Sequence, residues 1–206
     1  MDSNPSVSPS PRPVYLPEGD HQRVKILVAG PLGVGKTTAI KTLSQIPTLH
    51  TDEVMTDAAA GTDDVSLVGL RDKKTTTVAI DFGRLTLPGD RVVLYLYGTP
   101  GQRRFLPLWE GIAFGALGAL VLVDTRRLDE SFEVMDLIEE RGLPYAVAVN
   151  TFPDSPDYDL EIVRSKLDLA SDTPLVTCDA RELNSSLSAL IELTAHSIAT
   201  AEVGAS

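Results

Sequence analysis

Three glycines and a lysine lie close together between residues 30 and 37, in the order Gly-Pro-Leu-Gly-Val-Gly-Lys-Thr. This spacing matches G-x-x-x-x-G-K-[ST], a pattern in which backbone N–H groups surround the β-phosphate of a nucleotide. Lys36 supplies a compact positive charge for the β- and γ-phosphates, and the Thr37 hydroxyl is suited to Mg²⁺. The predicted chemistry is the binding of a nucleoside triphosphate together with magnesium.

The segments on either side of this loop favour the same interpretation. The apolar run VKILVAG, residues 24–30, precedes the loop, and a helical pattern follows it. A helix that begins here points the positive end of its dipole at the phosphates. The nucleotide-binding residues predicted in this segment are Gly30, Gly33, Val34, Gly35, Lys36, Thr37 and Thr38.

Short β-branched runs alternate with longer helical patterns from Val24 onward. Most runs are continuously apolar, which is typical of strands buried on both faces of a parallel sheet. The alternation predicts an α/β fold with helices on both faces of a mostly parallel sheet. The strand candidates are residues 24–30, 76–87, 91–98, 115–124, 144–150 and 173–179, and the helix candidates are residues 35–45, 130–141, 157–169 and 182–199.

One pair of predicted strands cannot be joined by a crossover helix. Only Pro88-Gly89-Asp90 separates residues 76–87 from residues 91–98, and this is a turn composition. Parallel strands need a connection of a dozen or more residues. The two strands are therefore predicted to form an antiparallel hairpin at one edge of a six-stranded sheet.

Composition limits the classes of protein that the chain can represent. With 206 residues and 43% hydrophobic content, the chain is long enough for one domain, residues 23–200, between a Pro/Ser-rich disordered tail, residues 1–22, and a flexible C-terminus, residues 201–206. The single Cys178 indicates a reducing cytoplasm. Neither a membrane-spanning run nor a lipid-anchor signal is recognised. The net charge of −11 argues against nucleic acid as a partner.

The run TVAIDFGRLTLPGDRVVLYLYGTPGQRRF, residues 77–105, resembles switch I, the interswitch hairpin and switch II of Ras-like small GTPases, especially those of the Rab type. The form GTPGQ, with the later NTF and CDAR, resembles the bacterial conservon-type GTP-binding proteins. The similarity covers about residues 23–200. It implies a small-GTPase-like P-loop NTPase fold: a six-stranded, mostly parallel sheet with one antiparallel edge strand and helices on both faces.

The resemblance also implies roles at the phosphate end. Thr77 matches the switch I threonine that meets Mg²⁺ and the γ-phosphate, with Thr75 and Thr76 as alternatives. Gly101 would donate its N–H to the γ-phosphate, and Gln102 would orient the attacking water. The implied catalytic residues are Gln102, Lys36 and Thr77, and the implied metal ligands are Thr37 and Thr77.

Gly98 departs from the family pattern, because eukaryotic members have Asp there. The carboxylate behind a magnesium-bound water is therefore missing from its usual position. Asp81 and Asp124 are candidates for a substitute, although either also suits an ordinary carboxylate at the end of a strand. Gly98 predicts weaker magnesium dependence or slow hydrolysis.

The segment YAVAVNTFPD resembles the guanine-binding Asn-Lys-x-Asp pattern that follows an apolar strand. Asn150 matches, Thr151 replaces the lysine, Pro153 stands where the aspartate belongs, and Asp154 follows one residue late. The later TCDAR resembles the loop whose alanine N–H contacts guanine O6. The base-binding residues implied are Asn150, Asp154, Asp179 and Ala180.

Together these features predict a molecular switch that binds GTP with Mg²⁺ and slowly hydrolyses it to GDP and phosphate. Conservon-type proteins imply a roadblock-type regulatory protein and a sensor-kinase-like system as partners, with recruitment to the membrane through a partner as one option. Two alternatives stay open. One is a nucleotide-binding scaffold with little hydrolysis or relaxed base specificity, and the other is a small-molecule P-loop kinase.

Overall fold

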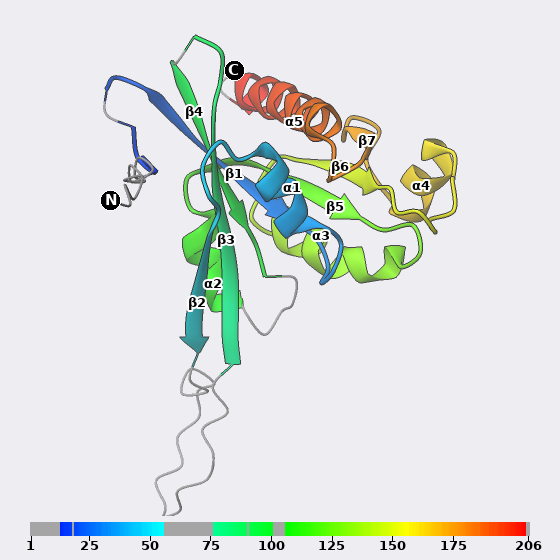
Figure 1. Cartoon of the computed structure of the whole chain (residues 1–206). Coiled ribbons are helices and arrows are strands. Elements are labelled where there is room, and N and C mark those ends of the chain that lie inside the picture. Colours follow the sequence, from blue (N-terminus) through cyan, green and yellow to red (C-terminus); the bar gives the residue numbers. More distant parts are fainter. Residues whose placement is uncertain (1–12, 18, 56–75, 90, 101–105, 205–206) are drawn as a thin grey trace, which may run out of the picture.

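The structure, a computed structural model, describes residues 13–17, 19–55, 76–89, 91–100 and 106–204. Strands and helices alternate along most of this chain (Figure 1). The elements are β1 (Gln22–Ala29), α1 (Lys36–Leu43), β2 (Leu49–Met55), β3 (Thr76–Thr86), β4 (Val92–Gly98), α2 (Leu106–Ala113), β5 (Ala116–Val123), the 3₁₀ turn η3 (Leu128–Ser131), α3 (Phe132–Glu139), β6 (Tyr145–Asn150), α4 (Leu160–Lys166), β7 (Leu175–Cys178) and α5 (Leu183–Gly204).

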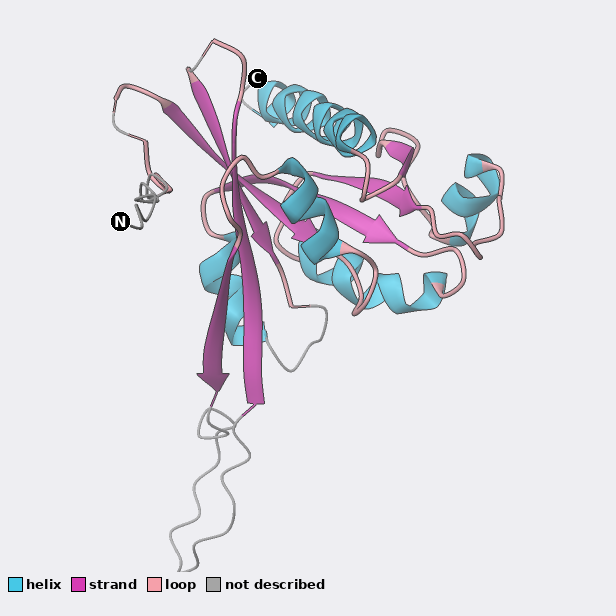
Figure 2. Ribbon diagram, viewed as in Figure 1, coloured by secondary structure: helices cyan, strands magenta, loops and turns pink. Residues whose placement is uncertain are grey.

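The strands form a single sheet in the order β2-β3-β4-β1-β5-β6-β7. Strands β4, β1, β5, β6 and β7 are paired in parallel, whereas β3 is antiparallel to both β4 and β2. The predicted α/β fold class is confirmed, including the hairpin of β3 and β4. Figure 2 shows helices on both sides of the sheet, with the lower ends of β2 and β3 extending beyond them.

Within the described residues the sheet has seven strands, whereas six were predicted. The additional strand is β2, with the sequence LHTDEVM, which pairs antiparallel with β3 and extends the sheet beyond the hairpin. It was not predicted because polar and apolar residues mix along it and no continuous apolar run marks it. An edge strand needs no such run, since it is paired on one side only.

Helix α2 was also absent from the predicted elements. Its sequence, LPLWEGIA, is short, has proline in the first turn and includes a glycine, which disfavours a helix. Tertiary contacts stabilise α2 despite its low helix propensity. Trp109 is fully buried, and its indole N–H donates to the Pro100 carbonyl over 3.1 Å. The other predicted helices and strands are present, with boundaries shifted by a few residues.

The two faces of the sheet bury separate hydrophobic clusters. One cluster combines β1, β4 and β5 with side chains of α1 and α5, and the other combines the opposite strand faces with side chains of α2, α3 and α4. Residues Ile26–Ala29 are all fully buried because consecutive side chains point into opposite clusters. Helices therefore cover both faces, as the continuous apolar runs predict. None of the helices in the described ranges is both long and apolar enough to cross a membrane.

The parallel order brings four strand ends together. Strands β1, β5, β6 and β7 are neighbours and run in the same direction, so their carboxyl ends meet at one edge of the sheet. Ligands of open α/β sheets bind outside this edge. The predicted nucleotide-binding loops follow β1, β6 and β7, so the topology places them beside one another.

Gly118 allows α5 to pack closely on the sheet. A Cβ at this position would lie 2.5 Å from Ser197 Oγ and 3.0 Å from Leu193 Cδ1, both on α5. We expect Gly118→Ala to lower the free energy of unfolding by about 1–3 kcal/mol, measured by urea denaturation. Gly111→Ala is the control, since a Cβ there meets nothing within 4 Å and should stabilise α2 by roughly 0.5–1 kcal/mol. Equal effects of the two substitutions would contradict this packing.

Candidate functional site

The loop between β1 and α1 has the backbone conformation expected of a phosphate-binding loop. Gly30 and Gly35 have φ values of 135° and 106°, which L-residues with side chains rarely adopt. A Cβ at Gly30 would lie 2.4 Å from the Leu122 carbonyl oxygen, and one at Gly35 would lie 2.6 Å from Asn150 Nδ2. Both glycines are therefore required by the local geometry. Thr38 lies exposed in the first turn of α1.

Lys36 extends back into this loop. Its Nζ donates to the carbonyl oxygens of Gly30 and Pro31 over 2.7 and 2.8 Å. Burial lowers the pKa of Lys36 to about 8, with Asp81 opposing the shift and Arg127 adding to it. The loop thus holds a partly desolvated ammonium where the motif expects the phosphates, and a bound polyphosphate would favour its charged form.

Asp81 joins the phosphate loop to the edge of the sheet. The Thr37 hydroxyl, at the start of α1, donates to Asp81 Oδ2. The other carboxylate oxygen lies 2.5 Å from Nδ1 of His50, which is paired opposite Asp81 on β2. Asp81 is 9% exposed. One buried carboxylate therefore connects α1, β3 and β2.

Asp81 also lies beside Gly98, the position where the family pattern has a carboxylate. The register pair Phe82–Tyr97 places Asp81 opposite Gly98 on the neighbouring strand. A Cβ at Gly98 would lie 3.1 Å from Asp81 Cβ and 3.4 Å from its Oδ2. An aspartate at position 98 would therefore compete with Asp81 for the same space, so β3 supplies the carboxylate that β4 lacks.

The donor set at this point suits magnesium. The Thr37 hydroxyl and the Asp81 carboxylate are oxygen donors in direct contact with each other, and Mg²⁺ prefers one or two carboxylates together with phosphate oxygens and water. Thr37 and Asp81 are thus the described residues that would hold the ion.

Of the three residues predicted from the switch segments, the structure describes only the backbone of Thr77. Thr77 lies in β3 opposite Val54. It is four residues from Asp81, which corresponds to about 13 Å along a strand. Gly101 and Gln102 lie outside the described residues. The roles predicted for these three residues therefore stay predictions.

Asn150, at the end of β6, links three loops. Its Nδ2 donates to the Val34 carbonyl over 2.8 Å, and its Oδ1 accepts from the Ala180 N–H over 2.9 Å. The side chain is buried, and the residue is only 4% exposed. The predicted residues Val34, Gly35, Asn150 and Ala180 are therefore brought together, as expected from the ends of neighbouring strands.

The two predicted carboxylates at the base end are both paired with arginines. Asp154 accepts from Arg126 Nη1 over 2.7 Å. Asp179 accepts from Arg181 Nε and Nη2 over 2.8 and 2.7 Å, and also from the Arg181 backbone N–H. These hydrogen bonds lower the pKa of Asp179 to about 2, so it is ionised at neutral pH.

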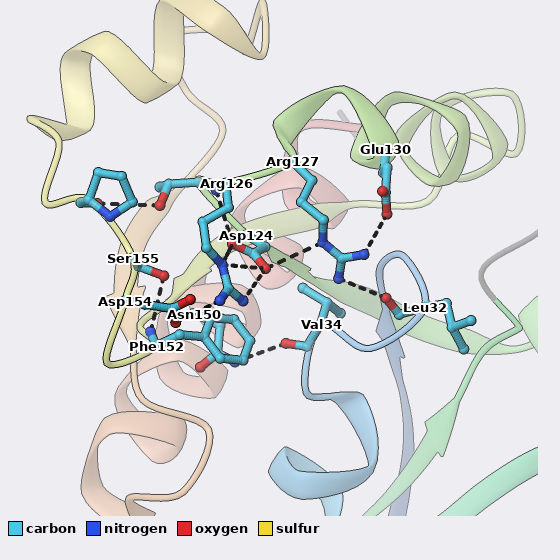
Figure 3. A network of polar contacts seen from close by, with 12 residues as sticks. Leu32, Val34, Asp124, Arg126, Arg127, Glu130, Asn150, Phe152, Asp154 and Ser155 are labelled. Carbon is cyan, nitrogen blue, oxygen red and sulfur yellow. Dashed lines mark hydrogen bonds and ion pairs between the residues drawn. The ribbon is translucent and has the colours of Figure 1, made fainter.

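Arg126 and Arg127 are site residues that the sequence reasoning missed. Both contact Asp124, a fully buried carboxylate that directly follows β5 (Figure 3). Arg127 continues to the Leu32 carbonyl in the phosphate loop over 2.9 Å, and to Glu130 over 3.0 Å. The Arg126 hydrogen bond lowers the pKa of Asp124. A usable signal was present: an Asp followed closely by two arginines at the end of a buried strand.

Comparison with known proteins identifies relatives of this chain. A family described as conserved hypothetical ATP-binding proteins matches residues 28–200. An uncharacterized protein of Methanocaldococcus jannaschii is 30% identical over 129 residues, which span 62% of this chain and 69% of the relative.

Solved structures with a similar fold include a FeoB G-domain and the cytosolic domain of a FeoB iron transporter. The FeoB G-domain of Methanococcus jannaschii has a TM-score of 0.55 at 14% identity, and the match covers 85% of this chain and 98% of that one. The cytosolic domain of the T. maritima FeoB iron transporter, in its apo form, has a TM-score of 0.60 at 14% identity, with 85% and 64% covered. At this identity the likeness shows the fold, which is that of a P-loop G-domain.

The pKa of Lys36 makes a prediction for nucleotide binding. In the free protein the pKa of Lys36 is about 8, and bound phosphates would raise this pKa. Above about pH 8, nucleotide binding is therefore accompanied by the uptake of a proton by Lys36. We expect affinity to be constant below about pH 7 and to approach a tenfold loss per pH unit above about pH 9, measured by fluorescent-nucleotide titration. Lys36→Arg is the control, since arginine stays charged and any titration of the nucleotide itself affects both proteins. Identical pH profiles for the two proteins would contradict the prediction.

Proposed function

Because this chain belongs to the family of conserved hypothetical ATP-binding proteins and has a P-loop G-domain fold, we propose that it is a nucleotide-dependent switch. In this proposal it binds GTP with Mg²⁺, slowly hydrolyses it to GDP and phosphate, and signals through the protein partners that distinguish the two states. The central supporting observation is the contact between Thr37 and Asp81, which joins the phosphate loop directly to β3.

That contact gives the switch a physical basis. Thr37 belongs to the element that binds phosphates, while Asp81 and His50 belong to the two strands at the edge of the sheet. Whatever binds to Thr37 and Asp81 must change the contacts that hold β2 and β3. A triphosphate and a diphosphate would therefore favour different arrangements of the hairpin, which is how a ligand shifts a two-state element.

Magnesium would be held by Thr37 and Asp81 together with phosphate oxygens and water. When bound, it would neutralise negative charge on the β- and γ-phosphates. Lys36 would bind the same phosphates, and Gln102 would orient the water that attacks the γ-phosphate. Slow turnover is proposed because β3, not β4, supplies the carboxylate next to Gly98.

The preference for guanine is part of the proposal. Asn150 and Ala180, which are both implied as base-binding residues, lie in contact, and Asp154 lies on the loop that follows Asn150. The family description favours a second candidate, a scaffold that binds adenine nucleotides or has relaxed base specificity. Asp154 stands one residue later than the aspartate of the guanine-binding pattern. The choice between guanine and adenine depends on whether it still reaches the base.

The proposed partners follow from the resemblance to conservon-type proteins. They are a roadblock-type regulatory protein and a sensor-kinase-like system, which would act on a cytoplasmic protein and recruit it to the membrane. Neither partner needs a segment of this chain to enter the membrane.

Single-turnover hydrolysis tests the proposed function. Purified protein loaded with GTP should release phosphate slowly, and protein loaded with ATP should release it more slowly still. Neither sample should transfer phosphate to small acceptors. Gln102→Ala should reduce the rate roughly 10- to 100-fold without weakening nucleotide binding. Lys36→Ala, which should lose binding itself, controls for contaminating hydrolases. Release of phosphate from neither nucleotide, or at equal rates from ATP and GTP, would favour the second candidate, and phosphate transfer to an acceptor would favour a kinase.

The role proposed for Asp81 makes a separate prediction. Asp81→Asn should raise the Mg²⁺ concentration needed to retain bound nucleotide by roughly tenfold, because a neutral amide is a poorer ligand for a hard cation. Retention in EDTA should be nearly unchanged. Asp157→Asn, at an exposed position, is the control. The measurement is the dissociation rate of a fluorescent nucleotide across a Mg²⁺ series, and an unchanged Mg²⁺ requirement would count against Asp81.

A further inference from the structure

The loop after β6 lacks two charged residues of the guanine-binding pattern. Thr151 stands in place of the lysine and Pro153 in place of the aspartate, so Asp154 is the nearest carboxylate. The Asp154 side chain is 73% exposed. An exposed side chain samples several rotamers unless a partner holds it, and this freedom weakens recognition. Base recognition by Asp154 therefore requires an anchor.

Arg126 has the geometry of such an anchor. Its Nη1 donates to Asp154 Oδ1 over 2.7 Å, while its Nε and Nη2 donate to the Asp124 carboxylate over 2.9 and 2.7 Å. The guanidinium carbon lies 4.2 Å from the centre of the Phe152 ring. Because Asp124 is fully buried, one side of the guanidinium is fixed, and the ring fixes its plane. Figure 3 shows these residues as one connected group.

The backbone of this loop is also held next to the end of β5. The Ser155 N–H donates to the Phe152 carbonyl over 3.0 Å, and the Phe152 N–H donates to Ser155 Oγ over 3.2 Å, which closes a tight turn around Asp154. Thr125, the neighbour of Arg126, donates from its hydroxyl to the Pro156 carbonyl over 3.3 Å. The segment after β5 therefore determines where Asp154 lies.

The neighbouring arginine provides a contrast at the same anchor. Arg127 also contacts Asp124, but it extends to the Leu32 carbonyl of the phosphate loop. Arg126 extends to the loop that follows Asn150. The two side chains diverge from one carboxylate toward the two ends of the nucleotide site, so their substitutions should have different effects.

We propose that Arg126 is a positioning residue for nucleobase recognition, which holds the Asp154 carboxylate where it accepts from the ring N–H and the 2-amino group of guanine. Arg126, which follows the neighbouring strand β5, thereby supplies the positive charge that the lysine of the pattern would supply at position 151. Asp154 supplies the carboxylate that the pattern has at position 153. This inference rests on the proposed function, since it requires the bound base to be guanine.

The test compares GDP, IDP and ADP by equilibrium titration. IDP differs from GDP only in lacking the 2-amino group, so the ratio of the two affinities isolates that contact. The wild-type protein should prefer GDP over IDP by roughly 10- to 100-fold. Arg126→Ala should bring this ratio close to one by weakening GDP more than IDP, because IDP keeps the ring N–H but lacks the 2-amino group. Arg126→Lys should restore part of the ratio. Arg127→Ala should weaken GDP and IDP equally.

Asp154→Asn gives the same readout from an exposed position, so it keeps the test valid if Arg126→Ala destabilises the fold around Asp124. It should also abolish the GDP preference. A preference that survives both Arg126→Ala and Asp154→Asn would overturn this inference alone, as would an equal loss of GDP and IDP binding in Arg126→Ala. A wild-type protein that binds ADP as tightly as GDP would contradict the proposed function and, with it, this inference.

Discussion

The two hydrogen bonds of the Asn150 carboxamide are the contact on which the arrangement of this site depends. One reaches the Val34 carbonyl in the phosphate loop, and the other reaches the Ala180 N–H beyond β7. Such a buried amide can be satisfied only while the carboxyl ends of β1, β6 and β7 stay aligned. The alignment in turn requires glycine at position 35, because a Cβ there would meet the amide at 2.6 Å. The loops proposed for phosphate binding and for base recognition are therefore held together at one edge of the sheet.

At this edge, charges missing from the expected sequence positions are supplied by adjacent strands. Asp81 on β3 fills the space beside Gly98 on β4. Arg126, which follows β5, reaches the loop that follows β6, where a lysine would otherwise stand at position 151. Neighbouring strands lie about 5 Å apart, so a charged side chain on either strand can reach the same point in space. We infer that a motif is satisfied here by position in space, not by position in the chain.

This relation explains what sequence reasoning could and could not find. The phosphate loop and the hairpin follow from local patterns, and the meeting of the loops after β1, β6 and β7 follows from the geometry of parallel strands. The hydrogen bonds of Asn150 to Val34 and Ala180 were not predicted. Asp81 was predicted only as one of two candidates, with Asp124, for the carboxylate missing at Gly98. The register that places Asp81 opposite Gly98 is not visible in the sequence. Strand β2 and helix α2 lack periodicity or propensity of their own and depend on tertiary contacts. Arg126 and Arg127 were missed because an arginine after a strand is ordinarily a solvated surface charge.

In the proposed switch, the Thr37–Asp81 contact couples the phosphate loop to the edge strands β2 and β3. Amide hydrogen exchange, compared between protein loaded with GDP and protein loaded with a non-hydrolysable GTP analogue in Mg²⁺, tests it most directly. Protection should differ between the two states in β2 and β3. It should stay the same in α5, which packs on β5, β6 and β7. The difference should disappear in Asp81→Asn. Equal protection of β2 and β3 in the two nucleotide states of the wild-type protein would contradict the account.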